Sequence, residues 1–145
     1  VLTRLEKLDN GEFGALVLAA AGLRRLGLEG RIHRYFTLQE MLPAAGQGIL
    51  AVQCRRDMDT SFLDCVRDRD AELCARAERA FIRALDGGCS SPVAAHAVIE
   101  GESMKISGLF VDINNKISRG LLCGIPEQGE SLGTLLAEKL KEEAA

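Results

Sequence analysis

Apolar residues recur at helical spacing over residues 71–85, and this is the clearest periodic pattern in the chain. The apolar positions of this segment are Leu73, Cys74, Ala77, Phe81, Ala84 and Leu85. Asp70 can cap a helix at the start of the segment, and Gly87 and Gly88 end it. The pattern therefore predicts an amphipathic helix here, and a similar pattern predicts a last one over residues 131–142.

Between these two helices the chain reads as three strands. They are predicted over residues 93–99, 104–111 and 116–123, and the second partly alternates between apolar and polar positions. Asn114 and Asn115 can adopt the positive φ values of a tight hairpin turn, so the last two strands are expected to run antiparallel. The order helix, three strands, helix predicts a small α+β unit.

The N-terminal part of the chain has its apolar residues in continuous runs. Residues 13–20 form such a run after a turn signal, which fits a strand buried on both faces, as in a parallel sheet covered by helices. Residues 32–36 and 49–54 read as further short strands. Short helical segments are predicted over residues 2–8 (or an extended piece there), 21–27 and 62–67. This part therefore resembles a portion of an α/β domain.

The composition is that of a soluble globular protein, with 47% hydrophobic and 27% charged residues among 145. The net charge of -3 is mild and does not indicate a nucleic-acid partner. The longest apolar run, residues 15–22, is far too short to span a bilayer. The chain starts at Val1 with no signal-peptide pattern, so we expect a cut inside a larger protein.

Five cysteines bear on possible chemistry, and no two form a CxxC pair, so no metal site is predicted. Their odd number indicates free thiols in a reducing cytoplasm. The four that lie in apolar segments are expected to be small buried residues: Cys54, Cys65, Cys74 and Cys123. Cys89 differs because it lies in the run DGGCSSP at residues 86–92, which favours an open turn. Such a thiol could anchor a group, attack one, or act in redox chemistry.

Four spaced segments resemble the porphobilinogen deaminase (hydroxymethylbilane synthase) family. They are ERAF with LDGGCSSPVA at residues 78–81 and 85–94, TRL with KLDNG within residues 3–11, LA through GLRRLG within residues 18–27, and LPAAGQG at residues 42–48. Because they occur in one order over most of the chain, the resemblance is far more specific than a single short pattern. Ser91 departs from the family, which usually has a β-branched residue there.

This resemblance implies a transferase of tetrapyrrole (haem) biosynthesis. The family joins four porphobilinogen molecules into hydroxymethylbilane and releases ammonia at each step. It builds the product on a dipyrromethane cofactor, which is attached by a thioether to the cysteine that Cys89 matches. The resemblance also implies a cytoplasmic monomer with a small-molecule substrate and neither nucleic-acid nor membrane partners.

The same resemblance assigns further cofactor-binding residues. Arg4 and Arg25 match arginines of the family's motifs, and a guanidinium can bind the carboxylates of pyrrole side chains bidentately. Gln47 and Gly48 match a loop that contacts the cofactor, and Ala19 lies at the end of the predicted buried strand near the site. The arginines expected to be solvated or structural are Arg24, Arg76, Arg79 and Arg83.

The resemblance also implies a domain organisation. Residues 1–43 correspond to the C-terminal part of the family's second domain, 44–67 to a return segment of the first, and 71–145 to the third. The expected fold is the remainder of a periplasmic-binding-protein-like α/β domain, followed by a small α+β domain with a three-stranded antiparallel sheet. The family's catalytic aspartate falls outside this chain. No catalytic acid or base is therefore assigned, and the fragment is expected to lack turnover.

Two other classes of function remain open on the residues alone. A non-catalytic module could bind an anionic, carboxylate-rich ligand through its arginines, and Cys89→Ser would then leave binding intact. A thiol redox protein could use Cys89, although no resolving cysteine lies nearby in the sequence and a helix C-terminus raises the pKa of a neighbouring thiol.

Overall fold

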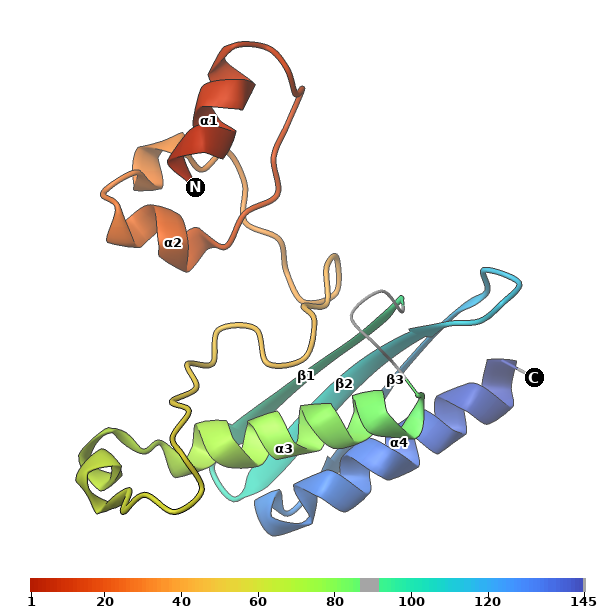
Figure 1. The fold of residues 1–145 in the computed structure, drawn as a ribbon. Helices are drawn as coiled ribbons and strands as arrows, with labels where there is room; N and C mark the ends of the chain where they lie inside the picture. The colour runs from red at the N-terminus through yellow and green to blue at the C-terminus, as the bar shows by residue number, and fades with distance from the viewer. Residues whose placement is uncertain (87–91, 145) are drawn as a thin grey trace. The chain divides into compact units, whose positions relative to one another are not determined.

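The computed structural model describes residues 1–86 and 92–144, which form two compact units, Val1–Thr37 and Leu38–Ala145 (Figure 1). Each unit has its own buried residues. The larger unit contains all the β-strands of the described residues, so it carries the sheet and its core.

The larger unit is built on an antiparallel sheet of three strands in the order β1-β2-β3. Its elements are α3 (Arg69–Ala84), β1 (Val93–Glu100), β2 (Ser103–Val111), β3 (Ile117–Gly124), the 3-10 helix η3 (Pro126–Gln128) and α4 (Gly129–Ala144). Helices α3 and α4 lie side by side along one face of this sheet (Figure 1). The predicted order of helix, three strands and helix is confirmed.

The turn between β2 and β3 is stabilised by one carboxylate. Asp112 Oδ1 accepts hydrogen bonds from the backbone N–H groups of Asn114 and Lys116, both at 2.8 Å. Asn115 has a φ of 62°, in the left-handed region that asparagine tolerates better than most residues. The predicted antiparallel hairpin is therefore formed, but of the two asparagines expected to have a positive φ only Asn115 has one.

The core of the larger unit lies between the sheet and the two helices. Its largest fully buried side chains are Phe81, Met104, Ile106, Leu136 and Leu140. The helices approach closely where a side chain is missing: a Cβ added at Gly133 of α4 would overlap the carbonyl oxygen of Ala77 on α3.

Helix α3 begins two residues earlier than predicted. Its N-cap is Asp68, whose Oδ1 accepts a hydrogen bond from the Ala71 N–H at 3.0 Å, and Asp70 lies in the first turn. The prediction that Asp70 caps the helix was therefore wrong. Both aspartates lie near the positive end of the helix, and only the local hydrogen-bond geometry distinguishes them.

The smaller unit contains two short helices and a 3-10 turn. These are α1 (Leu2–Asp9), α2 (Ala20–Arg25) and η1 (Glu29–Arg31). Only Leu5 and Leu23 are buried in it. Arg31 on η1 forms an ion pair with Asp9 at the end of α1 and so connects η1 to α1.

The strands predicted over residues 13–20, 32–36 and 49–54 are not formed, and these segments have no regular secondary structure before α2 begins at Ala20. Val17 and Leu50 within them are 59% and 91% exposed. A strand of a parallel sheet takes its backbone hydrogen bonds from neighbouring strands, and the described residues provide no such neighbours. The expected α/β sheet is therefore absent from the described residues.

The helix predicted over residues 62–67 is the 3-10 helix η2 (Ser61–Val66). In the described part of the chain, no helix is both long enough and apolar enough to cross a membrane.

Candidate functional site

The position of Cys89 falls outside the described residues, in the stretch 87–91 that follows α3 in the sequence. On the described side, α3 ends at Ala84, Leu85 caps it, and Asp86 has a left-handed φ of 52°. Strand β1 begins at Val93. The helix therefore ends before Gly87, and the open turn predicted around Cys89 lies outside the described residues.

The predicted cofactor loop, residues 44–48, is a compact turn in the larger unit. The Gln47 N–H donates to the Ala44 carbonyl and the Ile49 N–H donates to the Gly46 carbonyl, both at 3.2 Å. Gly46 and Gly48 have φ values of 78° and 83°. Because L side chains rarely adopt such angles, glycine at both positions allows the turn around Gln47.

The buried carboxylate of Glu78 connects this loop to α3 and β1. Its Oε2 accepts a hydrogen bond from the Gly46 N–H at 2.6 Å, and its Oε1 accepts one from the Ala97 N–H at 2.8 Å. His96 Nδ1 lies 3.7 Å from Oε1. The residue is only 3% exposed. Glu78 lies in the ERAF motif, but the motif alone does not predict this role. The available signal in the sequence is a carboxylate between Ala77 and Phe81, on the apolar side of the predicted helix.

Three predicted site residues lie in the smaller unit, on or beside its two helices. Arg4 is on α1, Arg25 is the last residue of α2, and Ala19 is the N-cap of α2. Among the described residues, neither the Arg4 nor the Arg25 guanidinium has a polar partner, and both residues are exposed. These two cations are therefore available to a carboxylate ligand.

Arg24, next to Arg25, is used within the unit instead. Its Nε donates to Glu29 Oε1 at 2.9 Å and its Nη2 donates to the Tyr35 hydroxyl at 3.3 Å. The hydrogen bond with Tyr35 and, as the next largest cause, the hydrogen bond with Glu29 raise the pKa of Arg24 above its ordinary value. The expectation that Arg24 is structural or solvated agrees with this geometry.

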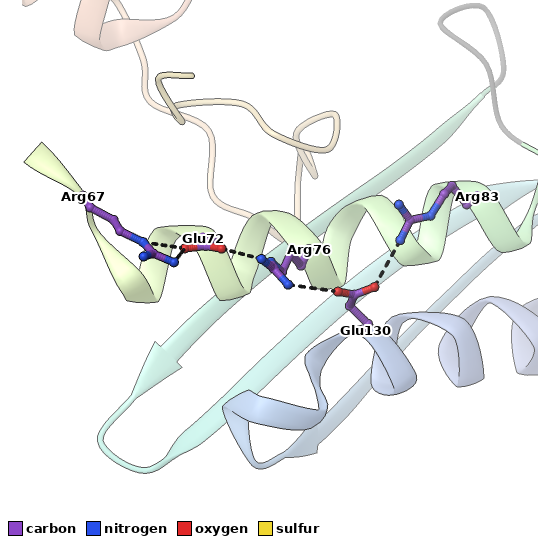
Figure 2. A network of polar contacts seen from close by, with 5 residues as sticks. All are labelled: Arg67, Glu72, Arg76, Arg83 and Glu130. Carbon is purple, nitrogen blue, oxygen red and sulfur yellow. Dashed lines mark hydrogen bonds and ion pairs between the residues drawn. The ribbon is translucent and has the colours of Figure 1, made fainter. Parts of the chain in front are cut away.

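Arg67, just before α3, and two arginines of α3 form an ion-pair network with two glutamates (Figure 2). Arg67 and Arg76 each approach Glu72 to 2.6 Å, and Arg76 and Arg83 approach Glu130 of α4 at 3.7 and 3.4 Å. The hydrogen bond from Arg67 and, as a smaller cause, the one from Arg76 lower the pKa of Glu72 below its ordinary value. The network joins α3 to α4, so the predicted structural role of Arg76 and Arg83 agrees with these contacts.

The described cysteines differ from the prediction. Only Cys74 is buried; Cys54 is half-buried, and Cys65 and Cys123 are exposed. Burial is the main cause that raises the pKa of the Cys74 thiol, and the nearby carboxylate of Glu78 is the second. This thiol therefore stays protonated and unreactive. Among residues 1–86 and 92–144, no cluster of three or more potential metal ligands occurs.

A pocket of about 420 Å³ opens on the sheet face away from α3 and α4. Its lining includes Lys105 and Arg119 as well as the apolar side chains of Leu38 and Leu42. Arg119 Nη1 donates to the Gln39 carbonyl at 2.6 Å and holds residues 38–42 against this face.

Comparison with known proteins gives two family matches in one order along the chain. The model described as "Porphobilinogen deaminase, dipyromethane cofactor binding domain" matches residues 1–62, and the one described as "Porphobilinogen deaminase, C-terminal domain" matches residues 72–142. The chain belongs to the porphobilinogen deaminase family.

Individual relatives agree with this assignment. The porphobilinogen deaminase of Acetivibrio thermocellus is 54% identical over 140 residues, which is 97% of this chain and 48% of the relative. The enzyme of Alkaliphilus oremlandii is 51% identical over 143 residues, 99% of this chain and 48% of the relative. A Coxiella burnetii porphobilinogen deaminase is 43% identical over 145 residues, which is 97% of this chain and 47% of the relative. The chain thus spans about half the length of the curated relatives it matches.

The cofactor-binding family match covers five of the six predicted site residues. Arg4, Ala19, Arg25, Gln47 and Gly48 lie in residues 1–62. The anchor candidate, Cys89, falls within the C-terminal domain match. The porphobilinogen deaminase relationship thus places the predicted residues in two matched domains.

Proposed function

We propose that this chain forms the C-terminal half of a porphobilinogen deaminase. In this proposal the whole enzyme is a transferase that joins four porphobilinogen units into hydroxymethylbilane and releases ammonia at each step. The observation that carries the proposal is the pair of family matches in sequence order over residues 1–62 and 72–142. We expect a cytoplasmic monomer.

The domain organisation belongs to the same proposal. Residues 1–43 end one α/β domain, residues 44–67 return to another, and residues 71–145 form the third domain. The exposed apolar side chains within 13–20 and 49–54 support this division, because such runs need strands on either side to bury them. The catalytic aspartate and further arginines would come from the other half of the enzyme, so residues 1–145 alone are expected to lack turnover.

The residues present fit a dipyrromethane group. The group carries acetate and propionate side chains, and Arg4 and Arg25 are exposed cations without polar partners among the described residues. A guanidinium binds a carboxylate through two parallel hydrogen bonds. When bound, the group supplies the pyrrole end to which new units are joined. Arg4 and Arg25 would neutralise its carboxylates, Gln47, Gly48 and Ala19 would line its site, and Cys89 would hold it by a thioether.

The covalent anchor is tested by the mass of the Cys89 peptide. A full-length enzyme containing these 145 residues is purified, digested and analysed by mass spectrometry. The Cys89 peptide is expected to carry the mass of dipyrromethane, and Cys89→Ser is expected to abolish both the adduct and activity. Cys65→Ser is the matched control, because Cys65 is an exposed thiol of the same chain and should change neither. An unmodified Cys89 in active enzyme contradicts the proposal.

The adjacent arginines of α2 allow a matched test of carboxylate binding. Arg25→Gln removes a free cation, and losing one charge-assisted hydrogen bond is expected to lower kcat/KM roughly 10- to 100-fold. Arg24→Gln removes a cation already paired with Glu29 and should leave kcat/KM within about twofold per folded enzyme. Equal effects of the two substitutions would contradict the assignment of Arg25.

The pocket beside Lys105 and Arg119 favours a second candidate, a module that binds an anionic ligand without chemistry. This candidate predicts that Cys89→Ser retains full affinity for a carboxylate-rich ligand such as porphobilinogen, measured by calorimetry. The transferase predicts instead that the same substitution removes the covalent cofactor.

A further inference from the structure

We propose that Glu78 is a positioning residue that fixes the 44–48 loop to α3 and β1, so that Gln47 and Gly48 present a preformed surface to the cofactor. The inference rests on the proposed function for the role of this loop. Glu78 itself is assigned no contact with substrate or cofactor.

The geometry of Glu78 is that of a clamp with one oxygen on each side. Oε2 takes the Gly46 N–H from the loop and Oε1 takes the Ala97 N–H from β1. Strand β1 is at the edge of the sheet, so among residues 1–86 and 92–144 no strand on its outer side takes this N–H. The carboxylate therefore joins three segments that are separated in sequence: the loop, α3 and β1.

Burial of a carboxylate at this position is costly, and this indicates a specific role. The α3 positions around it are filled by apolar side chains such as Ala77 and Phe81, both fully buried. A charged group taken out of water is tolerated only when strong hydrogen bonds replace its hydration. An apolar residue would seal the helix to the sheet equally well, but it could not hold the loop.

The clamp also connects the two parts of the proposed cofactor site within the larger unit. Gly46 directly precedes Gln47, and α3 continues from Glu78 to Ala84, five residues before Cys89 in the sequence. A helix is a rigid spacer, with a rise of about 1.5 Å per residue. A short hydrogen bond to Gly46 therefore fixes the loop relative to the helix that leads to the anchor.

The isosteric substitution Glu78→Gln removes one half of the clamp with little change in volume. Glutamine offers one carbonyl oxygen and one NH₂ group, so whichever way the amide turns, one of the two backbone N–H groups faces a donor. The Ala97 N–H belongs to an ordered strand, whereas the Gly46 N–H belongs to a loop. We therefore expect the loop to be released.

The experiment uses a full-length enzyme containing these 145 residues, with kinetics normalised to the fraction of molecules that carry the cofactor. Glu78→Gln is expected to lower kcat/KM about 10- to 100-fold per loaded enzyme, the equivalent of one hydrogen bond to a charged group. Gln47→Ala should give a comparable loss, and the double variant should be no worse than the more affected single variant, because both act through one loop. Additive losses in the double variant would overturn the proposal.

Two controls separate positioning from stability. Ile106→Val removes one buried methyl group from the same core without touching the loop, and it should leave kcat/KM per loaded enzyme unchanged. Hydrogen exchange measures the clamp directly: the Gly46 amide should be protected in the unmodified enzyme and exchange at least tenfold faster in Glu78→Gln. An unprotected Gly46 amide in the unmodified enzyme overturns the proposal without any variant.

The failure of this inference can be distinguished from the failure of the proposed function. If the unmodified enzyme carries no dipyrromethane, the proposed function fails, and the exchange of the Gly46 amide still tests the clamp. If the enzyme is loaded and active while Glu78→Gln matches it in kcat/KM and in exchange, only the positioning role fails.

Discussion

The two units of this chain differ in how much of their apolar surface they bury by themselves. The layer formed by α3, α4 and the sheet encloses fully buried side chains such as Phe81, Ile106 and Leu136, whereas residues 1–37 bury only Leu5 and Leu23. Phe13 and Val17 of the smaller unit remain exposed. The C-terminal layer therefore has its packing partners within residues 69–144, whereas the apolar side chains of the N-terminal unit find few partners among the described residues. We expect cooperative stability in the first and local opening in the second.

The largest effect is expected from truncating a buried aromatic side chain in the C-terminal layer. Phe81→Ala should lower the free energy of unfolding of this layer by about 3–5 kcal/mol, because it removes a fully buried ring and leaves a cavity. Phe13→Ala is the matched control in the smaller unit, where the ring is 45% exposed, and it should cost less than about 1 kcal/mol. Urea unfolding followed by circular dichroism measures the free energy of unfolding of both variants. Equal losses in the two variants would contradict the difference in burial between the units.

Two glycines give the next test. Gly133→Ala places a methyl group against the Ala77 carbonyl oxygen, so α3 and α4 must separate, and overpacking of this kind costs about 1–3 kcal/mol or more. Gly30→Ala in η1 meets no atom within 4 Å and should be nearly neutral. The midpoint of thermal unfolding compares the variants; a stable Gly133→Ala would show that the helices are not in close contact.

A smaller effect is expected at the start of α3. Asp68→Ala removes the N-cap hydrogen bond to the Ala71 N–H and should cost about 1 kcal/mol. Asp70→Ala removes only a charge in the first turn, which is worth about 0.3–1 kcal/mol at low salt. Denaturant titration at low and high salt separates the two, because the Asp70 effect should fade with added salt whereas the hydrogen-bond part of the Asp68 effect should persist. The reverse order would restore Asp70 as the cap.

The smallest effect is expected in the network of Figure 2. Hydrogen bonds from Arg67 and Arg76 lower the pKa of Glu72 in the folded protein. The ionised Glu72 therefore stabilises the fold fully above the usual carboxyl pKa, and this contribution is lost as the pH falls through the lowered pKa. Glu72→Gln should therefore reduce the dependence of unfolding temperature on pH at its acid end. Glu102→Gln, at an exposed turn residue with no ion pair among the described residues, should leave that dependence unchanged. Identical pH profiles for both variants would remove any role of the network in stability.

Much of the C-terminal layer could be predicted from the sequence because its signals are local. The periodicity over 71–85 predicted α3 to within two residues at its start and one at its end, and Asn114 and Asn115 predicted the hairpin turn. The strands predicted over 13–20, 32–36 and 49–54 failed for the opposite reason. A continuous apolar run indicates burial, but strand formation also needs hydrogen-bonding partners, which the described residues do not supply.

In the candidate site, too, the features that depend on neighbouring residues could be predicted, and those that depend on distant residues could not. The ordered motifs identified the family, the glycines predicted the turn at residues 44–48, and the apolar period predicted the helix that precedes Cys89 in the sequence. The pairing of Arg24, the lack of a polar partner for Arg25 among the described residues, and the hydrogen bonds of Glu78 became visible only in the folded structure. Gly46 and Ala97, the partners of Glu78, lie 32 and 19 residues away from it in the sequence. Helix period and turn chemistry depend on neighbouring residues, whereas the partners of a buried carboxylate depend on which distant backbone groups the fold brings within hydrogen-bond distance.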